Sequence, residues 1–265
     1  MGKKETIRTR IWREEAEPDN PFAAAACYCH GYDVFGDVVG KASWIEYLFL
    51  LFRGERPTRL QAKTLEDLAV ALANPGPRDH GVHAAMSGGA GGSHNAACLM
   101  AALAVGAGQL GGAREVALAM DIWTECGTSL SSWKNRLKNP PQEERADVWP
   151  TLEHPPGFDP HGASCATPVC QLLRHLSEQS LAGTLRWLDE KRPDLEAIAD
   201  CPLTITGIAA AALHDLGFTS SQGEMLFLLL RLPGAAVHAI EQKELGYRHF
   251  PFFQDALHLE NDPGP

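Results

Sequence analysis

The chain has 265 residues, a net charge of −10 and an isoelectric point of about 5.5, with 45% hydrophobic and 21% charged residues. These values are ordinary for a globular protein and exclude a mainly disordered chain. The acidic balance argues against a nucleic-acid or membrane-surface partner, because both need an excess of lysine and arginine. No apolar run approaches the roughly 20 residues that span a bilayer, so we expect no membrane partner either.

The cysteines are odd in number and scattered, at Cys27, Cys29, Cys98, Cys126, Cys165, Cys170 and Cys201. Because they form no even framework and the chain is not small, we predict free thiols in a reducing cytoplasm. Cys27, Cys29 and His30 could ligate a metal ion, but no second Cys/His pair stands at zinc-site spacing. Small thiols entering a core are the simpler interpretation, and we expect no metal site.

Residues 1–21 are polar and charged, and we predict that they form an N-terminal arm. Ser43 has Glu46 three residues later, and this capping box predicts a helix over Trp44–Arg53 that ends at Gly54. Apolar residues at helical spacing predict further helices downstream. These cover Leu60–Ala73, Asn95–Val105, Ala113–Trp123, Leu181–Leu188, Ile205–Leu216, Gln222–Leu230 and Ala235–Leu245.

Two kinds of segment separate these helices. The glycine-rich run Ser87–Ser93 lacks both the G-x-G-x-x-G frame after a strand and the lysine of a phosphate loop, so nucleotide binding is a weak interpretation. Pro233 and Gly234 interrupt the last helical pattern. Because few segments alternate and no β-α-β rhythm occurs, we predict a mainly α fold.

The middle of the chain, residues 127–180, differs from the rest. It carries charged residues, a pair of prolines at Pro140 and Pro141, and then a segment rich in proline, glycine and histidine from Glu153 to Gly162. Such a segment does not form a helix interior. We predict a long loop between helices, which is where functional residues often lie.

Five short motifs, in one order, resemble the citrate synthase superfamily and within it the citryl-CoA lyases and the citryl-CoA lyase module of ATP-citrate lyase. The motifs are H-G-Y-D-V with A-S-W-I-E-Y-L-F-L-L-F-R-G-E-R-P (30–57), D-H-G with S-G-G-A and H-N (79–95), Q-L-G-G-A (109–113), T-I-T-G-I (204–208) and F-L-L-L-R-L-P-G followed by His238, Glu241 and Gln242 (227–242). The family patterns they resemble include G-x-L-P at the end of the first motif, L-H-G-G-A for the third and N-V-D-G for the fourth.

The resemblance implies a citrate synthase-like fold: a large helical domain over residues 22–113 and 206–256, and a smaller inserted helical lobe over residues 114–205. It implies an obligate homodimer with helices packed across the two-fold axis. It also implies chemistry between a CoA thioester and a keto acid, both as substrates and with no bound cofactor. That chemistry needs a carboxylate for the methyl proton, a donor for the enolate oxygen, a histidine for the carbonyl or alcohol, and arginines for carboxylates.

The sequence departs from the family pattern at each catalytic position. Leu110 stands at the histidine of L-H-G-G-A, as a non-histidine also does in the ATP-citrate lyase module. Thr206 replaces the aspartate of N-V-D-G, and a hydroxyl cannot serve as a base near neutral pH. In the loop that resembles P-G-F-G-H, the histidine position is Pro160 without a gap and His161 with one inserted residue.

We therefore predict His161 as the acid–base histidine, Asp159 as a displaced carboxylate beside it, and Thr206 at the third catalytic position. The loop residues Pro156, Gly157 and Phe158 are the predicted CoA contacts, and the predicted acid-binding residues are His80, His94, Arg231 and His238. Each of these residues also has a purely structural alternative. Arg231 could form a structural salt bridge, His238 could be a core histidine, and residues 155–162 could form a solvated loop. His80, His83 and His94 invite a metal interpretation, but no carboxylate is spaced with them as in a zinc motif.

Two functions follow. The first is a citryl-CoA lyase-like or citrate synthase-like enzyme that makes or cleaves a C–C bond between an acyl-CoA and a keto acid. Its acyl-CoA can be a non-standard CoA thioester. The alternative is a catalytically silent member of the family that serves as a sensor of CoA metabolites or as a partner subunit, because Thr206 is not a carboxylate.

Overall fold

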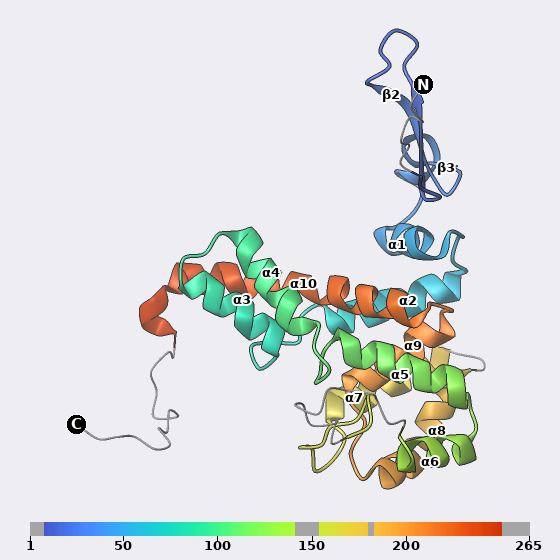
Figure 1. The fold of residues 1–265 in the computed structure, drawn as a ribbon, viewed down its shortest axis with the longest axis vertical. Coiled ribbons are helices and arrows are strands. Elements are labelled where there is room, and N and C mark those ends of the chain that lie inside the picture. The colour runs from blue at the N-terminus through green and yellow to red at the C-terminus, as the bar shows by residue number, and fades with distance from the viewer. Residues whose placement is uncertain (1–7, 141–153, 180–182, 251–265) are drawn as a thin grey trace, which may run out of the picture.

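A computed structural model describes residues 8–140, 154–179 and 183–250, and the structural statements below concern these residues. They are mainly helical, as predicted (Figure 1). The elements are β1 (Trp12–Ala16), β2 (Ala24–Cys29), β3 (Tyr32–Asp33), η1 (Val34–Val38), α1 (Trp44–Arg53), α2 (Arg59–Leu72), α3 (His80–Ala90), α4 (Asn95–Gly106), α5 (Ala113–Cys126), α6 (Leu130–Lys138), α7 (Thr167–Gln179), α8 (Thr184–Ala199), α9 (Ile205–Asp215), α10 (Ser220–Leu245) and η2 (Tyr247–His249).

A small antiparallel sheet of order β1-β2-β3 projects from one end of the molecule (Figure 1). Part of the segment predicted as an arm is thus a strand, β1, in which Trp12 pairs with Cys29 and Arg13 with Tyr28. The helical interpretation missed this sheet because β1 is exposed along its whole length and β2 begins with three alanines. Neither strand carries the alternation that marks a half-buried sheet.

The predicted start and end of α1 are confirmed. The Ser43 hydroxyl accepts from the Glu46 amide, and the Glu46 carboxylate accepts from the Ser43 amide at 2.7 Å. The helix ends at Gly54 in the left-handed region, at φ 74°. Local side-chain chemistry therefore sets both ends of this helix.

Of the glycine-rich run predicted as a connector, residues 87–90 belong to α3, and residues 91–93 connect α3 to α4. Asp79 caps the helix by accepting from the Val82 amide at 3.0 Å. A Cβ on Gly89 would overlap the carbonyl oxygen of Ala239 in α10, so glycine is required for the close contact of the two helices. The tertiary contact offsets the roughly 1 kcal/mol that a helical glycine costs.

The last helix, α10, is continuous, and the prediction of two helices separated at Pro233 is wrong. Proline leaves one helical hydrogen bond unmade, and the amide of the next residue, Gly234, donates to the carbonyl of Ala73 at 2.6 Å. By length and composition α10 alone, among the described residues, could cross a membrane. This is weak evidence for a membrane span, because α3, α4 and α5 pack along the helix.

The predicted long loop over residues 127–180 is wrong for two segments, which form α6 and α7. Each buries an apolar face: Trp133 in α6, and Leu173 and Leu176 in α7. The non-helical prediction is confirmed for residues 154–166, which contain the proline- and glycine-rich segment.

Aromatic packing fills the lobe formed by α5 to α8. The Trp123 ring lies 4.5 Å from that of Trp133 and 5.8 Å from that of Trp187, measured between centroids. Trp123 and Trp133 are buried in the core of this lobe, while Trp187 is partly buried against it.

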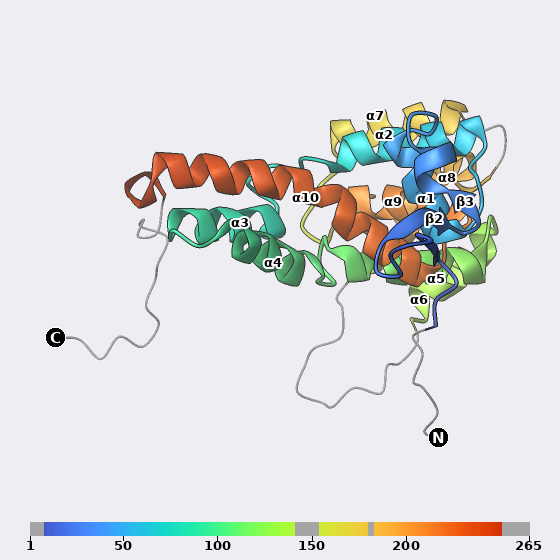
Figure 2. The same cartoon turned by 90° about the horizontal axis from the view of Figure 1, so that it is seen from above.

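Two packed regions share α10 (Figures 1 and 2). The body consists of α1, α2, α5 to α9 and the first half of α10, around a core of large side chains such as Phe49, Leu65, Met120 and Phe227. The extension consists of α3, α4 and the second half of α10, and points away from the body. Its buried core is small: Val82, Ala85, Cys98, Ala102, Ala235 and Ala239.

Candidate active site

Arg231 lies where the body meets the extension. Its Nη2 binds the carboxylate of Asp79, the cap of α3, and its Nη1 donates to the carbonyl of Gly111 at 2.8 Å. The guanidinium also lies over the Phe227 ring, 4.7 Å from the centroid. Burial lowers the pKa of Arg231, while the carboxylates of Asp79 and Glu115 act in the opposite direction. The cation is thus paired across helices, and not with a neighbour on its own helix.

Glu115, which the sequence analysis did not single out, lies at the centre of the site. Its side chain is 2% exposed, and its carboxylate accepts from the amides of Gly111 and Gly157 and from the hydroxyl of Thr206. The missed signal is its position on α5: residues 115, 119, 122 and 126 are all buried at helical spacing. A carboxylate on an apolar face requires such partners.

Thr206 lies in the first turn of α9 and is 1% exposed. Its hydroxyl donates to Glu115 Oε1 at 2.9 Å, and its oxygen lies 2.7 Å from the hydroxyl oxygen of Thr204. Because Thr206 has one hydroxyl hydrogen and gives it to Glu115, Thr204 is the donor in the second bond. At the position that the sequence resemblance assigns to an aspartate, this chain therefore has a hydroxyl engaged by Glu115 and Thr204.

The predicted CoA loop packs against the segment before α9. The amide of Asp159 donates to the carbonyl of Pro202 at 2.9 Å, and the amide of Thr204 donates to the carbonyl of Gly157 at 3.0 Å. Gly157 has φ 91°, and a Cβ there would lie 2.9 Å from the Cα of Gly207. Phe158 is buried, whereas Pro156 is partly exposed. Of the three predicted CoA contacts, only Pro156 therefore exposes surface to a ligand.

Asp159 and His161 are held together by a local turn. Asp159 Oδ1 accepts from the backbone amide of His161 at 2.8 Å. Asp159 is half-buried and His161 is exposed. This places the two residues next to each other at the surface of the loop.

The predicted acid-binding histidines lie apart from one another. His80 begins α3 and His94 precedes α4, so the 11 residues of α3 separate them by roughly 16 Å. His238 lies two turns beyond Arg231 on α10, and its Nε2 is 3.1 Å from Asn74 Oδ1. Within the described ranges, no three His, Cys, Asp or Glu side chains form a group that could hold a metal ion.

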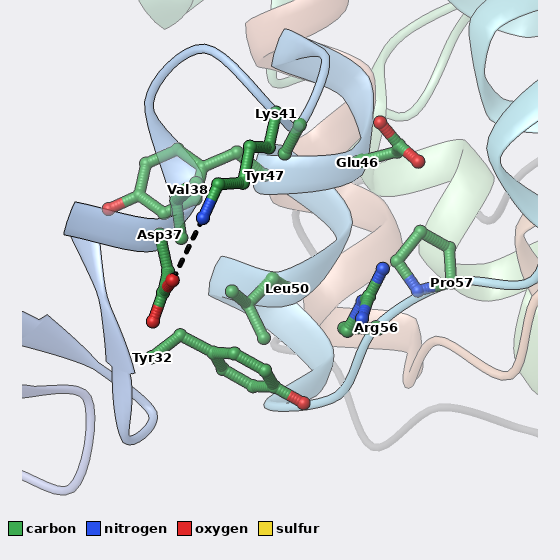
Figure 3. A pocket seen from close by; sticks show the side chains of 10 residues that line it. Tyr32, Asp37, Val38, Lys41, Glu46, Tyr47, Leu50, Arg56 and Pro57 are labelled. Atoms are coloured by element: carbon green, nitrogen blue, oxygen red, sulfur yellow. Dashed lines mark hydrogen bonds and ion pairs between the residues drawn. The ribbon is translucent and has the colours of Figure 1, made fainter. Parts of the chain in front are cut away.

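A cavity of about 390 Å³ lies elsewhere, between the small sheet, η1 and α1 (Figure 3). Tyr32, Tyr47 and Arg56 line it, together with an ion pair between Lys41 and Asp37 at 3.0 Å. None of the predicted site residues faces it. Beside Arg231 and Asp79 lies a small crevice, between α3, α4 and α10.

The fold is similar to that of three kinds of known enzyme. Citryl-CoA lyase from Hydrogenobacter thermophilus superposes with a TM-score of 0.74 at 19% identity, over 98% of this chain and 96% of that one. ATP citrate lyase from Methanothrix soehngenii, in complex with citrate and coenzyme A, gives 0.71 at 18% identity, over 99% of this chain. Citrate synthase from Thermotoga maritima gives 0.60 at 16% identity, over 83% of this chain.

The matches differ in how much of each enzyme they span. The chain spans 43% of the ATP citrate lyase and 59% of the citrate synthase, but nearly all of the citryl-CoA lyase. Neither a known family model nor a curated protein sequence matches the chain. The agreement in three dimensions over nearly the whole length establishes that this chain has the citryl-CoA lyase and citrate synthase fold.

Proposed function

We propose that this protein makes or cleaves a C–C bond between an acyl-CoA and a keto acid, in a reducing cytoplasm. One observation carries the proposal. The predicted acid-binding Arg231 and the predicted CoA loop are joined by consecutive hydrogen bonds through the Gly111 peptide and the Glu115 carboxylate. The two halves of the expected site thus meet in a fold shared with citryl-CoA lyase.

Each residue has a distinct role in this proposal. Arg231 binds a carboxylate of the acid through its guanidinium. His161 and Asp159 face the reacting atoms from the loop. His80, His94 and His238 are secondary acid-binding candidates, and because His80 and His94 lie at opposite ends of α3, a single chain does not use both on one small acid.

The proposed chemistry balances in the cleavage direction. His161 takes the proton of the tertiary alcohol, the carbonyl forms, and the electron pair of the broken C–C bond passes into the thioester as an enolate. Asp159 delivers a proton from Oδ2, the oxygen not bonded to the His161 amide, to the enolate carbon. Both groups exchange protons with solvent between turnovers. Synthesis is the reverse of these steps.

The experiment that tests this function is product analysis by mass spectrometry. Purified protein is incubated with citryl-CoA and, separately, with acetyl-CoA and oxaloacetate. We expect protein-dependent products in at least one direction and a loss of about 10²–10⁴-fold in His161→Ala. His175→Gln, a surface histidine that binds Asp67, is the matched control and should keep its activity. Unchanged turnover in His161→Ala would remove that residue's role.

A catalytically silent protein is the second candidate, favoured by the engagement of Thr206 with Glu115. Such a protein would bind CoA or acetyl-CoA without turnover, as a sensor or partner subunit. Isothermal titration with CoA, run beside the product analysis, separates the two candidates. Binding without product in either direction supports the silent protein.

We also propose that two copies of the chain associate through the extension. Val237 and Ile240, three residues apart on α10, and Val105 on α4 are each about half exposed. Exposed apolar side chains on both α4 and α10 favour a protein partner for the extension. Light scattering after size exclusion should give a dimer that dissociates in the Val237→Glu/Ile240→Glu variant, but not in Leu60→Glu on α2.

A further inference from the structure

Glu115 is a buried carboxylate that the reaction outlined above does not use. It occupies the first turn of α5 and is 2% exposed, and three donors from three segments reach its two oxygens. Oε1 accepts from the Gly157 amide at 2.7 Å and from the Thr206 hydroxyl. Oε2 accepts from the Gly111 amide. A group so enclosed does not reach a substrate, so its function must be exerted through its partners.

The partner that matters is Gly157, in the predicted CoA loop. Both backbone polar groups of this residue are fixed, since the amide donates to Glu115 and the carbonyl accepts from Thr204. Glycine is required here because φ is 91° and a Cβ would meet the Cα of Gly207. Two residues later the Asp159 carboxylate begins the turn that holds His161. The position of Gly157 therefore determines where the backbone places Asp159 and His161.

A carboxylate suits this position and an amide does not. Both oxygens of Glu115 act only as acceptors, and its three partners are donors. In Glu115→Gln, one end of the side chain becomes a donor. That end faces either the Gly111 amide or the Gly157 amide, and a buried amide then loses its partner.

We infer that Glu115 is a positioning residue, which holds the loop 155–162 in place through the Gly157 amide and so orients it for the CoA thioester. The part of this inference that concerns the thioester rests on the proposed function. The part that concerns the loop does not, because it can be measured without any ligand.

The test compares Glu115→Leu, which removes both acceptor oxygens, with wild type and with Glu224→Leu, which alters a carboxylate on α10 that pairs with Arg114. The first readout is hydrogen exchange, by mass spectrometry, of the peptide spanning residues 155–164 in ligand-free protein. We expect Glu115→Leu to exchange at least tenfold faster there, and Glu224→Leu to match wild type. Wild-type exchange in folded Glu115→Leu would overturn the inference.

The second readout separates positioning from general loss of structure. In Glu115→Leu the KM for the acyl-CoA should rise about tenfold and kcat should fall as well, because the displaced loop carries both the predicted CoA contacts and His161. A fall in kcat with an unchanged KM for the acyl-CoA would count against positioning. If wild type turns over no CoA thioester but the exchange result holds, the proposed function fails and Glu115 still anchors the loop.

Thr206→Val keeps the inference testable if Glu115→Leu does not fold. Valine preserves the shape of threonine and removes the hydroxyl donor, yet the bond between Glu115 and the Gly157 amide remains. Exchange of the 155–164 peptide should stay within about twofold of wild type. A tenfold acceleration would show that the loop is held through Thr206, and would overturn the inference.

Discussion

The two halves of α10 are buried by side chains of different size. In the body, its first half buries Leu226 and Phe227 against a core of other large side chains. In the extension, its second half buries Gly234, Ala235 and Ala239, and close backbone contact replaces side-chain volume. The body is therefore sensitive to lost volume and the extension to added volume.

The difference extends to polar groups. The body encloses Glu115 and Thr206 with partners, and Arg231 lies at its border with the extension. Among the described residues, the small core of the extension contains no buried charged side chain. The site is thus built where large packing elements exclude water and strengthen each hydrogen bond, while the extension offers exposed apolar surface.

The largest expected effect is in the body. Phe227→Ala removes a fully buried ring that also lies under Arg231, and should lower the free energy of unfolding by about 3–5 kcal/mol. Urea denaturation followed by circular dichroism measures it. Leu229→Ala, at a side chain 43% exposed on the same helix, should cost under about 1 kcal/mol. Equal losses would mean that the first half of α10 is not packed as described.

A second effect concerns the polar centre of the body. Thr206→Asp places a carboxyl group against the buried Glu115, and two carboxylates in one site cannot both ionise readily. One pKa of the pair is then raised in the folded state, so stability falls as pH rises from about 4 through that pKa. We expect this variant to lose about 2 kcal/mol more at pH 8 than at pH 5, relative to wild type.

The control for this prediction is Thr206→Asn, which has similar size and no charge. Its stability relative to wild type should not change with pH. A Thr206→Asp profile parallel to that of Thr206→Asn would show that the new carboxyl group turns away from Glu115. Proton exchange into acetyl-CoA, measured on the same variant, asks whether the restored carboxylate acts as a base.

A third effect tests the extension. Gly89→Ala forces a methyl group against the Ala239 carbonyl and should destabilise the protein by about 1–3 kcal/mol, although alanine is the better helix former. Gly91→Ala, at the end of the same helix, meets no atom closer than 3.4 Å and should be nearly neutral. Thermal unfolding of both variants measures the difference. A neutral Gly89→Ala would mean that α3 and α10 are not in close contact.

The smallest effect lies on the surface of the body, between α2 and α7. Desolvation opposes ionisation of Asp67, but hydrogen bonds from Lys63, Gln179 and His175 lower its pKa to about 2. A lowered pKa contributes stability above the unfolded value near 4, and this stability is lost as pH falls towards 2. Asp67→Asn should therefore cost about 1 kcal/mol at pH 6, and the difference should shrink at pH 2–3. If the difference in unfolding free energy between Asp67→Asn and wild type did not change with pH, the pairing of Asp67 with Lys63, Gln179 and His175 would be contradicted.

The sequence pattern predicted Arg231 but not Glu115, to which Arg231 is linked through Gly111. Arg231 was identifiable because a cation within a leucine run needs a partner, and the structure supplies Asp79. Glu115 was not predicted because it is not one of the replaced catalytic positions, although its place on the buried face of α5 could have revealed it. Its contacts with Gly157 and Thr206 join residues 42 and 91 positions away. No local pattern encodes such contacts.

What the sequence by itself determined are the features set by neighbours in the chain. Examples are the capped ends of α1, the mainly helical class, and the motif order that resembled citrate synthases. Only the tertiary structure decided whether glycine and proline would end a helix. Gly89 stays in α3 because Ala239 needs the space, and α10 continues past Pro233 because Gly234 donates to Ala73. Backbone propensities of about 1–3 kcal/mol are small enough for packing between distant segments to reverse them.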